Sequence, residues 1–131
     1  MTIEDSALSE RFVSAMHSPA TRAQALAQRG RTFSADWIVR IGTRPHLVRI
    51  HEGRVIDCAP HLPLLHPTRL SISGTVVAWH ALWEPVPRPG WHDIFALVKR
   101  GELRIEGDMQ LFHAHLQYLK DLLTLPRKES R

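Results

Sequence analysis

The histidines are the side chains of this sequence best suited to bind a metal ion, and there are nine of them. His113 and His115 stand about 200° apart on a predicted helix, so they cannot share an ion. His46 and His51 are an odd number of residues apart in an extended segment and face opposite sides. The sequence contains neither a His-x-x-x-His pair nor a Cys-x-x-Cys motif. It therefore predicts no metal site and no cofactor.

Nucleophilic and acid–base chemistry also lacks a recognisable set of residues. Cys58 beside Asp57 is not a nucleophile constellation, and we interpret Cys58 as a small core residue. Neither a Gly-x-Ser-x-Gly nor a P-loop pattern occurs. One enzymatic alternative stays open, because a small steroid-isomerase-like enzyme could use a single buried carboxylate as a proton shuttle. Its candidates are Asp36, expected on the outer face of a strand, Asp57, and Asp108, expected at a helix cap. We predict a non-catalytic protein with no catalytic residues.

The composition is that of an ordinary globular protein with a basic surface. The chain has 131 residues, 44% of them hydrophobic and 23% charged, and a net charge of +4. This length suits a single domain, which we place at residues 1–126, followed by a basic tail at 127–131. The dispersed basic residues and the lack of a nucleic-acid-binding signature predict no nucleic-acid partner, whereas the charge is compatible with peripheral contact with an anionic membrane. A single cysteine, an acidic N-terminus and no apolar run of about 20 residues predict a cytoplasmic protein.

Hydrophobic periodicity predicts an α+β fold. In the clearest strand, the alternate positions Phe33, Ala35, Trp37, Val39 and Ile41 form one buried face, and the positions between them include the polar residues Thr32, Ser34, Asp36 and Arg40. We expect a mostly antiparallel sheet with helices covering one face. The predicted helices cover residues 6–17, 18–29, 75–83, 91–100 and 109–125, and the predicted strands cover residues 31–41, 47–51, 54–59, 70–73 and 103–105.

The last predicted helix, residues 109–125, has more apolar surface than a helix resting on a sheet requires. On a helical wheel its polar residues fill an arc of roughly 100° and its apolar residues an arc of roughly 220°. His115 lies within the apolar arc, where we interpret it as a hydrogen-bonded core histidine. The surplus either lines a ligand cavity, since ligand pockets are mostly apolar, or is covered by neighbouring helices. The helical pattern alone leaves both alternatives open.

The segment Gly101-Glu102-Leu103-Arg104-Ile105-Glu106-Gly107-Asp108 precedes this helix. It resembles the closing segment of the sterol carrier protein type 2 family, a short strand followed by Gly-Asp and a final amphipathic helix. Further similarities lie upstream, at Trp37-Ile38-Val39-Arg40-Ile41, at Leu70-Ser71-Ile72-Ser73 followed by Trp79, and at Ile94-Phe95. The order of these segments agrees with the family over roughly residues 31–124. The proline-rich segment 84–90 and the Leu/Pro-rich segment 60–67 depart from it.

The resemblance implies a five-stranded sheet covered by helices and an apolar tunnel. It implies a binding or carrier protein for a hydrophobic lipid such as a sterol, a fatty acyl chain or an isoprenoid. An accessory or scaffold factor for ubiquinone or other lipid biosynthesis, acting through protein partners, is the alternative that the same resemblance offers.

We expect the lipid site to be lined from the second half of the chain. Trp79 and Trp83 are four residues apart and share one helix face. The full set of predicted lipid-binding residues is Trp79, Trp83, Phe95, Ile105, Met109, Phe112, Leu116 and Leu119. The apolar segments 62–65 and 85–87 are expected to be exposed, and they make a protein partner or a homodimer an additional hypothesis.

Overall fold

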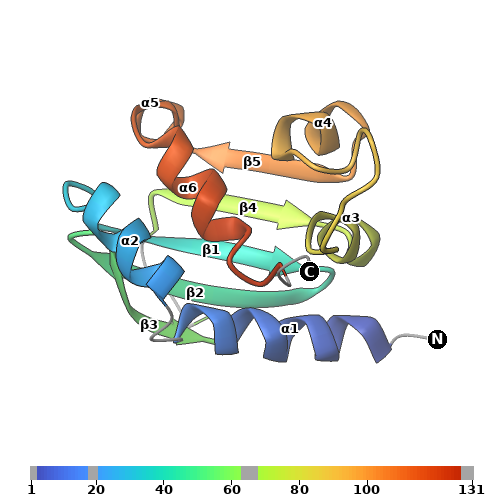
Figure 1. The fold of residues 1–131 in the computed structure, drawn as a ribbon, viewed down its shortest axis with the longest axis horizontal. Helices are drawn as coiled ribbons and strands as arrows, with labels where there is room; N and C mark the ends of the chain where they lie inside the picture. Colours follow the sequence, from blue (N-terminus) through green and yellow to red (C-terminus); the bar gives the residue numbers. More distant parts are fainter. Residues whose placement is uncertain (1–2, 18–20, 63–67, 128–131) are drawn as a thin grey trace.

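Five strands form the centre of the molecule, which we describe from a computed structural model over residues 3–17, 21–62 and 68–127. The sheet has the order β3-β2-β1-β4-β5 (Figure 1). Strands β1 and β4 run parallel, and the other three pairings are antiparallel, so the expected mostly antiparallel sheet is confirmed. The strands are β1 (Ala35–Ile41), β2 (Arg44–His51), β3 (Arg54–Ala59), β4 (Leu70–Gly74) and β5 (Leu103–Gly107).

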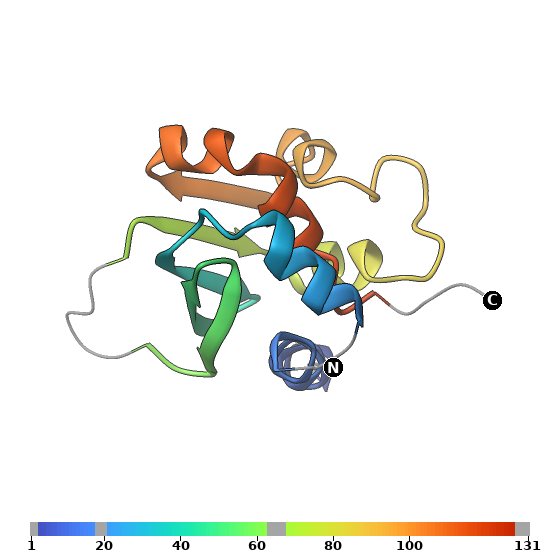
Figure 2. The ribbon, with the colours of Figure 1, turned by 60° about the vertical axis from the view of Figure 1, so that its left-hand side comes forward.

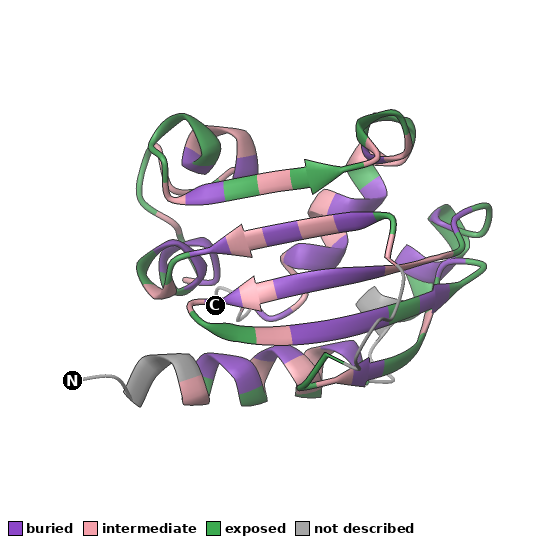
Figure 3. Ribbon diagram, turned by 180° about the vertical axis from the view of Figure 1, so that it is seen from behind, coloured by how far each residue is buried: buried purple, intermediate pink, exposed green. Residues whose placement is uncertain are grey.

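The helices lie together on one side of this sheet, with α1 along its β2–β3 edge (Figures 1 and 2). Seen from the other side, the strands are in front, and buried residues alternate with half-buried ones along β4, whereas β1 and β2 have continuous buried stretches (Figure 3). The helices are α1 (Ile3–Met16), α2 (Thr21–Arg29), α3 (Val76–Leu82), α4 (Ile94–Lys99), α5 (Met109–Ala114) and α6 (Leu116–Leu123). No helix among the described residues is long and apolar enough to span a membrane.

The strand register explains which residues form the core. Trp37 stands opposite Val48 on β2 and opposite Leu70 on β4, so the three side chains share the helix-covered face, and all three are buried. Asp36, one position earlier, points to the other face and forms an ion pair with Arg49 at 3.4 Å. The predicted outward position of Asp36 is therefore correct.

The last helix is where the prediction from the helical wheel is wrong. The predicted single helix 109–125 is two short helices, because His115 leaves helical geometry with φ −122° and ψ 28°. The His115 ring packs edge-on against Phe33, with the centroids 4.9 Å apart. It is half-buried rather than part of the core. Since α5 and α6 point in different directions, the apolar arc computed for one continuous helix is divided between two surfaces.

Smaller differences lie at element boundaries. The predicted helix 91–100 begins only at Ile94, because the Asp93 side chain caps it by accepting a hydrogen bond from the Phe95 amide at 3.1 Å. Strand β2 begins at Arg44 instead of Leu47, since Arg44 and Pro45 still pair with β1. Strand β1 begins at Ala35, after a turn in which the Phe33 amide donates to the Gly30 carbonyl. The Asp108 cap is present, with the Leu111 amide donating to its carboxylate at 2.9 Å.

Candidate functional site

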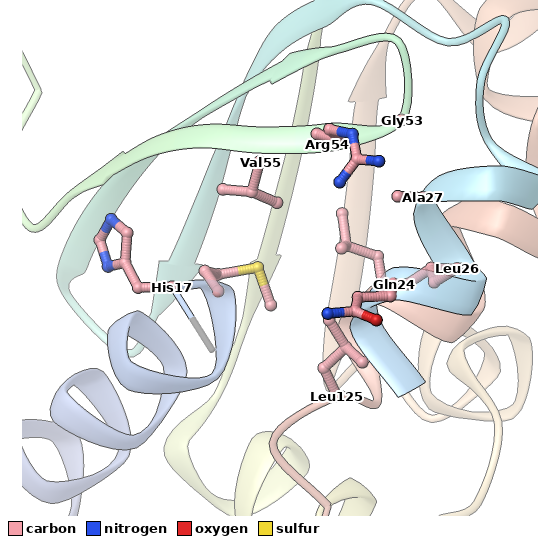
Figure 4. A pocket seen from close by; sticks show the side chains of 10 residues that line it. His17, Gln24, Leu26, Ala27, Gly53, Arg54, Val55 and Leu125 are labelled. Carbon is pink, nitrogen blue, oxygen red and sulfur yellow. The ribbon is translucent and has the colours of Figure 1, made fainter. Parts of the chain in front are cut away.

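A hollow of about 300 Å³ lies where α1 ends, between α2, the turn joining β2 to β3, and the end of α6 (Figure 4). This volume is at the small end of the range for ligand pockets. The hollow is lined by Met16, His17, Gln24, Leu26, Ala27, Gly53, Arg54, Val55, Leu122 and Leu125.

Two glycines and a tyrosine hold the walls of this hollow together. Gly53 has φ +80°, and a Cβ there would meet the Ala27 carbonyl at 2.4 Å, so only glycine lets the β2–β3 turn lie this close to α2. The Tyr118 hydroxyl, on α6, donates to the Gly53 carbonyl at 2.7 Å. A Cβ on Gly30, at the end of α2, would lie 2.1 Å from the Tyr118 ring. The turn, α2 and α6 therefore meet at one tightly packed point.

Two ion pairs help to fix the position of α6. Arg29 of α2 contacts Asp121 at 2.9 Å, and Lys120 contacts Asp93, the α4 cap, at 2.7 Å. Lys120 and hydrogen bonds from the first turn of α4 lower the pKa of Asp93 against the opposing effect of its burial, so both partners are charged near neutral pH. Helix α6 is thus fixed on both of its flanks, and its last turn is left facing the hollow.

The lining of the hollow is amphipathic. Leu26 and Leu122 are buried and Val55 and Leu125 are half-buried, and these aliphatic side chains contribute about half of the exposed lining, the rest being polar. The polar groups are at the rim, where Figure 4 shows the Arg54 guanidinium extending from the turn toward α2. Such a lining suits an amphiphile, whose chain contacts the aliphatic side chains and whose polar end contacts the rim.

The eight residues that the sequence predicted as lipid-binding do not line this hollow. Trp79, Trp83, Phe112 and Leu119 are buried in the main core, whereas Phe95, Ile105 and Leu116 pack half-buried against it. Met109 is 37% exposed and lies outside the core. Two contacts join members of the set: the Trp79 and Trp83 rings are 5.4 Å apart, and the Phe95 and Phe112 rings 6.1 Å apart. Leu116 also lines a second hollow of about 450 Å³ beside His113 and His115.

The predicted set and the hollow are connected through α6. Leu119 of the predicted set is buried in the core, and Leu122, three residues later on the same helix, lines the hollow. Sequence reasoning missed the walls that α1, α2 and the β2–β3 turn contribute, because the hollow exists only once these segments pack together. The signal that was present is the apolar face of residues 116–125, which includes Leu122 and Leu125.

The core contains one indole donor without an acceptor. Trp37 is fully buried, and no hydrogen-bond acceptor for its Nε1–H lies among the described residues. A buried donor left unpaired costs about 1–3 kcal/mol. The donor is on the helix-covered face of β1, within the layer that also contains the buried members of the predicted set.

Ser9 and His46 form a buried pair under α1. The His46 Nδ1 atom lies 3.0 Å from the Val39 carbonyl, which can only accept, so Nδ1 carries the proton. Nε2 is then the acceptor for the Ser9 hydroxyl at 2.6 Å. Burial lowers the pKa of His46, which keeps the ring neutral. With Ser9 at 6% and His46 at 0% exposure, this pair anchors α1 to β2 rather than meeting a substrate.

The carboxylates named for an isomerase lack the environment that such chemistry needs. A proton shuttle requires a carboxyl group whose pKa is raised by burial. The amide of Leu111 and the guanidinium of Arg69 instead lower the pKa of Asp108, and Asp57 is exposed. Asp36 pairs with Arg49 on the outer face. The thiol of Cys58 is buried, which raises its pKa to about 12, so it is a thiol at neutral pH.

Over residues 3–17, 21–62 and 68–127, no group of three or more histidine, cysteine, aspartate or glutamate side chains is arranged to hold a metal ion.

Comparison with known proteins identifies the fold. No protein-family model and no curated protein matches the sequence. Among solved structures, a crystal structure of sterol carrier protein 2 matches with a TM-score of 0.63 and 11% identity, covering 95% of this chain and 96% of that chain. Sterol carrier protein 2 from Yarrowia lipolytica, in its apo form, matches with a TM-score of 0.58 and 10% identity, covering 95% and 93%. The ubiquinone synthesis protein UbiJ-SCP2 matches at 0.54 and 15%, covering 87% and 84%. The chain has the sterol carrier protein 2 fold, as the sequence resemblance predicted.

Proposed function

We propose that this chain is a non-catalytic binding or carrier protein for a hydrophobic lipid with a polar end, of the sterol, fatty acyl or isoprenoid class. The observation that carries the proposal is the hollow between α2, the β2–β3 turn and α6, with its mixed aliphatic and polar lining. The likeness of the fold to sterol carrier protein 2 supports it. We place the protein in the cytoplasm.

The ligand enters at the hollow and extends beneath α6 into the layer that contains the predicted lipid-binding residues. Leu119 and Leu122 of α6, and Leu125 just after its end, mark this direction. Within the layer, the Trp37 indole N–H is the group that a hydroxyl or carbonyl oxygen of the ligand would pair with. This placement leaves out Met109, which is exposed, and Phe112, which is 1% exposed and packs in the core.

Native mass spectrometry of the purified protein tests whether a lipid is bound. We expect an added mass that is lost after extraction with organic solvent. Titration of the extracted protein with oleic acid should then shift the indole ¹H–¹⁵N resonance of Trp37, assigned with the variant Trp37→Phe. The proposal fails if no lipid co-purifies and oleic acid changes no resonance.

A second candidate function is an accessory role in lipid biosynthesis, in which the chain acts on a protein partner or as a homodimer. It is favoured by exposed apolar side chains in the segments that the sequence singled out, with Val86 at 73% and Leu62 at 37% exposure, although residues 63–65 lie outside the described part of the chain. The likeness to UbiJ-SCP2, a ubiquinone synthesis protein, also supports it. Analytical ultracentrifugation of the purified protein distinguishes a dimer from a monomer, and a strict monomer that co-purifies with no protein contradicts this role.

A further inference from the structure

One end of the molecule presents apolar and basic side chains together. Helix α3, the connection 84–93 and the end of α4 project at the end opposite the β2–β3 turn (Figure 2). Val77 is 56% exposed on α3 and Val86 is 73% exposed in the connection. Val76, Val77, His80 and Arg88 line a shallow hollow of about 280 Å³, so the connection folds against α3. We refer to this surface as the α3–α4 face.

Two guanidinium groups lie over the Trp91 ring in the α3–α4 face. The Arg88 guanidinium lies 5.1 Å and the Arg100 guanidinium 4.7 Å from the ring centroid. The Nε of Arg100 also donates to the Gly90 carbonyl at 3.0 Å. Gly90 permits this approach, because its φ is +85° and a Cβ would lie 2.5 Å from the guanidinium. The indole is half-buried and packs against the hydrophobic core, and the two guanidinium groups lie over its ring.

The α3–α4 face carries more positive than negative charge. Among the described residues, no carboxylate pairs with Arg88, Lys99 or Arg100. Of the nearby acidic residues, Asp93 is neutralised by Lys120 and Glu84 is half-buried. Glu102, after the end of α4, is also half-buried and accepts a hydrogen bond from the Thr75 hydroxyl at the start of α3. Such a face is complementary to an anionic surface.

We infer that the α3–α4 face is the surface by which the protein docks on an anionic lipid bilayer. Exposed valines enter the boundary between headgroups and acyl chains, as the apolar groups of peripheral proteins do. Trp91 occupies the headgroup level, where indole rings are enriched. Arg88, Lys99 and Arg100 meet the lipid phosphates. For a lipid carrier this contact would serve ligand exchange, and in that respect the inference rests on the proposed function.

Vesicle sedimentation tests the inference directly. We expect the protein to sediment with vesicles of phosphatidylcholine and phosphatidylglycerol, to bind pure phosphatidylcholine vesicles far less, and to dissociate as salt is raised. The double variant Val86→Glu/Arg88→Glu should lower the bound fraction by about fivefold or more, as expected from the contribution of each basic residue at an anionic surface. The control Ile56→Glu/Arg31→Glu makes the same change of charge, also replacing one exposed aliphatic residue and one exposed arginine, at the opposite end. Ile56 is 58% exposed there, and this variant should bind as the wild type does.

Tryptophan fluorescence gives a second readout. The other three tryptophans are 0% exposed, so a blue shift on adding anionic vesicles reports Trp91, and Trp91→Phe should abolish it. Equal binding to both vesicle types, no binding to either, or an equal loss in the control variant overturns the inference, and capture of a protein instead would assign the face to a protein partner. Binding of cis-parinaric acid in solution, measured on the same double variant, should be unchanged. A failure of that binding in the wild-type protein would contradict the proposed function and leave the docking result standing.

Discussion

At the residue scale, the fold depends on a few positions where neighbouring segments approach so closely that no other side chain fits. Gly30, Gly53 and Tyr118 meet where α2, the β2–β3 turn and α6 converge. Cys58, by contrast, is an ordinary small core residue, as the sequence indicated. Tyr118 was expected only as one apolar residue of the last helix, because nothing in the sequence shows that its hydroxyl reaches a carbonyl 65 residues away.

The variant Gly30→Ala is expected to be destabilised. Its Cβ would meet the Tyr118 ring at 2.1 Å, and relieving such overpacking costs about 1–3 kcal/mol. Urea denaturation measures the loss. Tyr118→Phe should cost about 1 kcal/mol by leaving the Gly53 carbonyl unpaired. The control Gly101→Ala has nothing within 4 Å and tests only the cost of its φ of +76°. Wild-type stability of Gly30→Ala would contradict the packing at this point.

The buried His46 predicts how stability depends on pH. Its pKa in the folded protein is lower than the ordinary value of 6.5, mainly through burial, so the unfolded chain binds more protons below that pH. The stabilisation is fully present above pH 6.5 and is lost as the pH falls toward the lowered pKa of the folded state. Urea denaturation across this window should show a steeper decline for the wild type than for His46→Phe, with His80→Asn, an exposed histidine, as control.

The lowered pKa of His46 can also be measured in the wild-type protein, which keeps the prediction testable if His46→Phe does not fold. An NMR titration of the wild-type histidine rings should give His46 the lowered pKa. A His46 ring that titrates at its ordinary pKa would show that α1 does not exclude water from the pair.

At the element scale, the periodicities predict the strands and most helices because each buries one face against the same core. Strand β1 is the clearest case, since Trp37, Val39 and Ile41 are all fully buried. The division between α5 and α6 could not be predicted, because Leu111 to Leu119 contains no proline or glycine to end a helix. The break reflects tertiary packing of His115 on Phe33, which overrides local propensity. The hollow could not be predicted from the sequence either, because its walls come from four separate segments.

The variant Phe112→Trp tests how tightly α5 packs. Phe112 is 1% exposed and contacts Phe95 edge-on, so we expect the larger ring to overpack the core and cost about 1–3 kcal/mol of unfolding free energy. Thermal denaturation monitored by circular dichroism measures the effect. If stability is unchanged while uptake of cis-parinaric acid falls, Phe112 lines ligand space instead of filled core.

At the scale of the whole molecule, the two ends of the described chain are joined. Arg11 of α1 donates to the Pro126 carbonyl at 3.0 Å and to the Trp83 carbonyl at 2.8 Å. Trp83 in turn donates to the Leu123 carbonyl at 2.6 Å. Arg127, expected in a solvated tail, donates instead to the Leu82 carbonyl at 2.9 Å. These contacts connect α1, α3 and α6, although they lie far apart in sequence.

The chain should therefore unfold in one cooperative step. Far-ultraviolet circular dichroism reports the helices and tryptophan fluorescence reports the buried indoles, and we expect the two urea transitions to coincide. Arg11→Met should lower the midpoint while keeping the transitions together, since it leaves two carbonyls without their donor. Separate transitions would show that α1 unfolds independently of the sheet.

The most direct test of the lipid-binding account is titration of delipidated protein with cis-parinaric acid, comparing Leu125→Trp with Met109→Trp. Leu125 lines the hollow, whereas Met109 is exposed outside it, so both variants gain the same indole at contrasting positions. We expect saturable binding by the wild type and by Met109→Trp, and binding about tenfold weaker in Leu125→Trp with little change in stability. Absence of saturable binding in the wild type, or wild-type affinity in Leu125→Trp, would contradict the account.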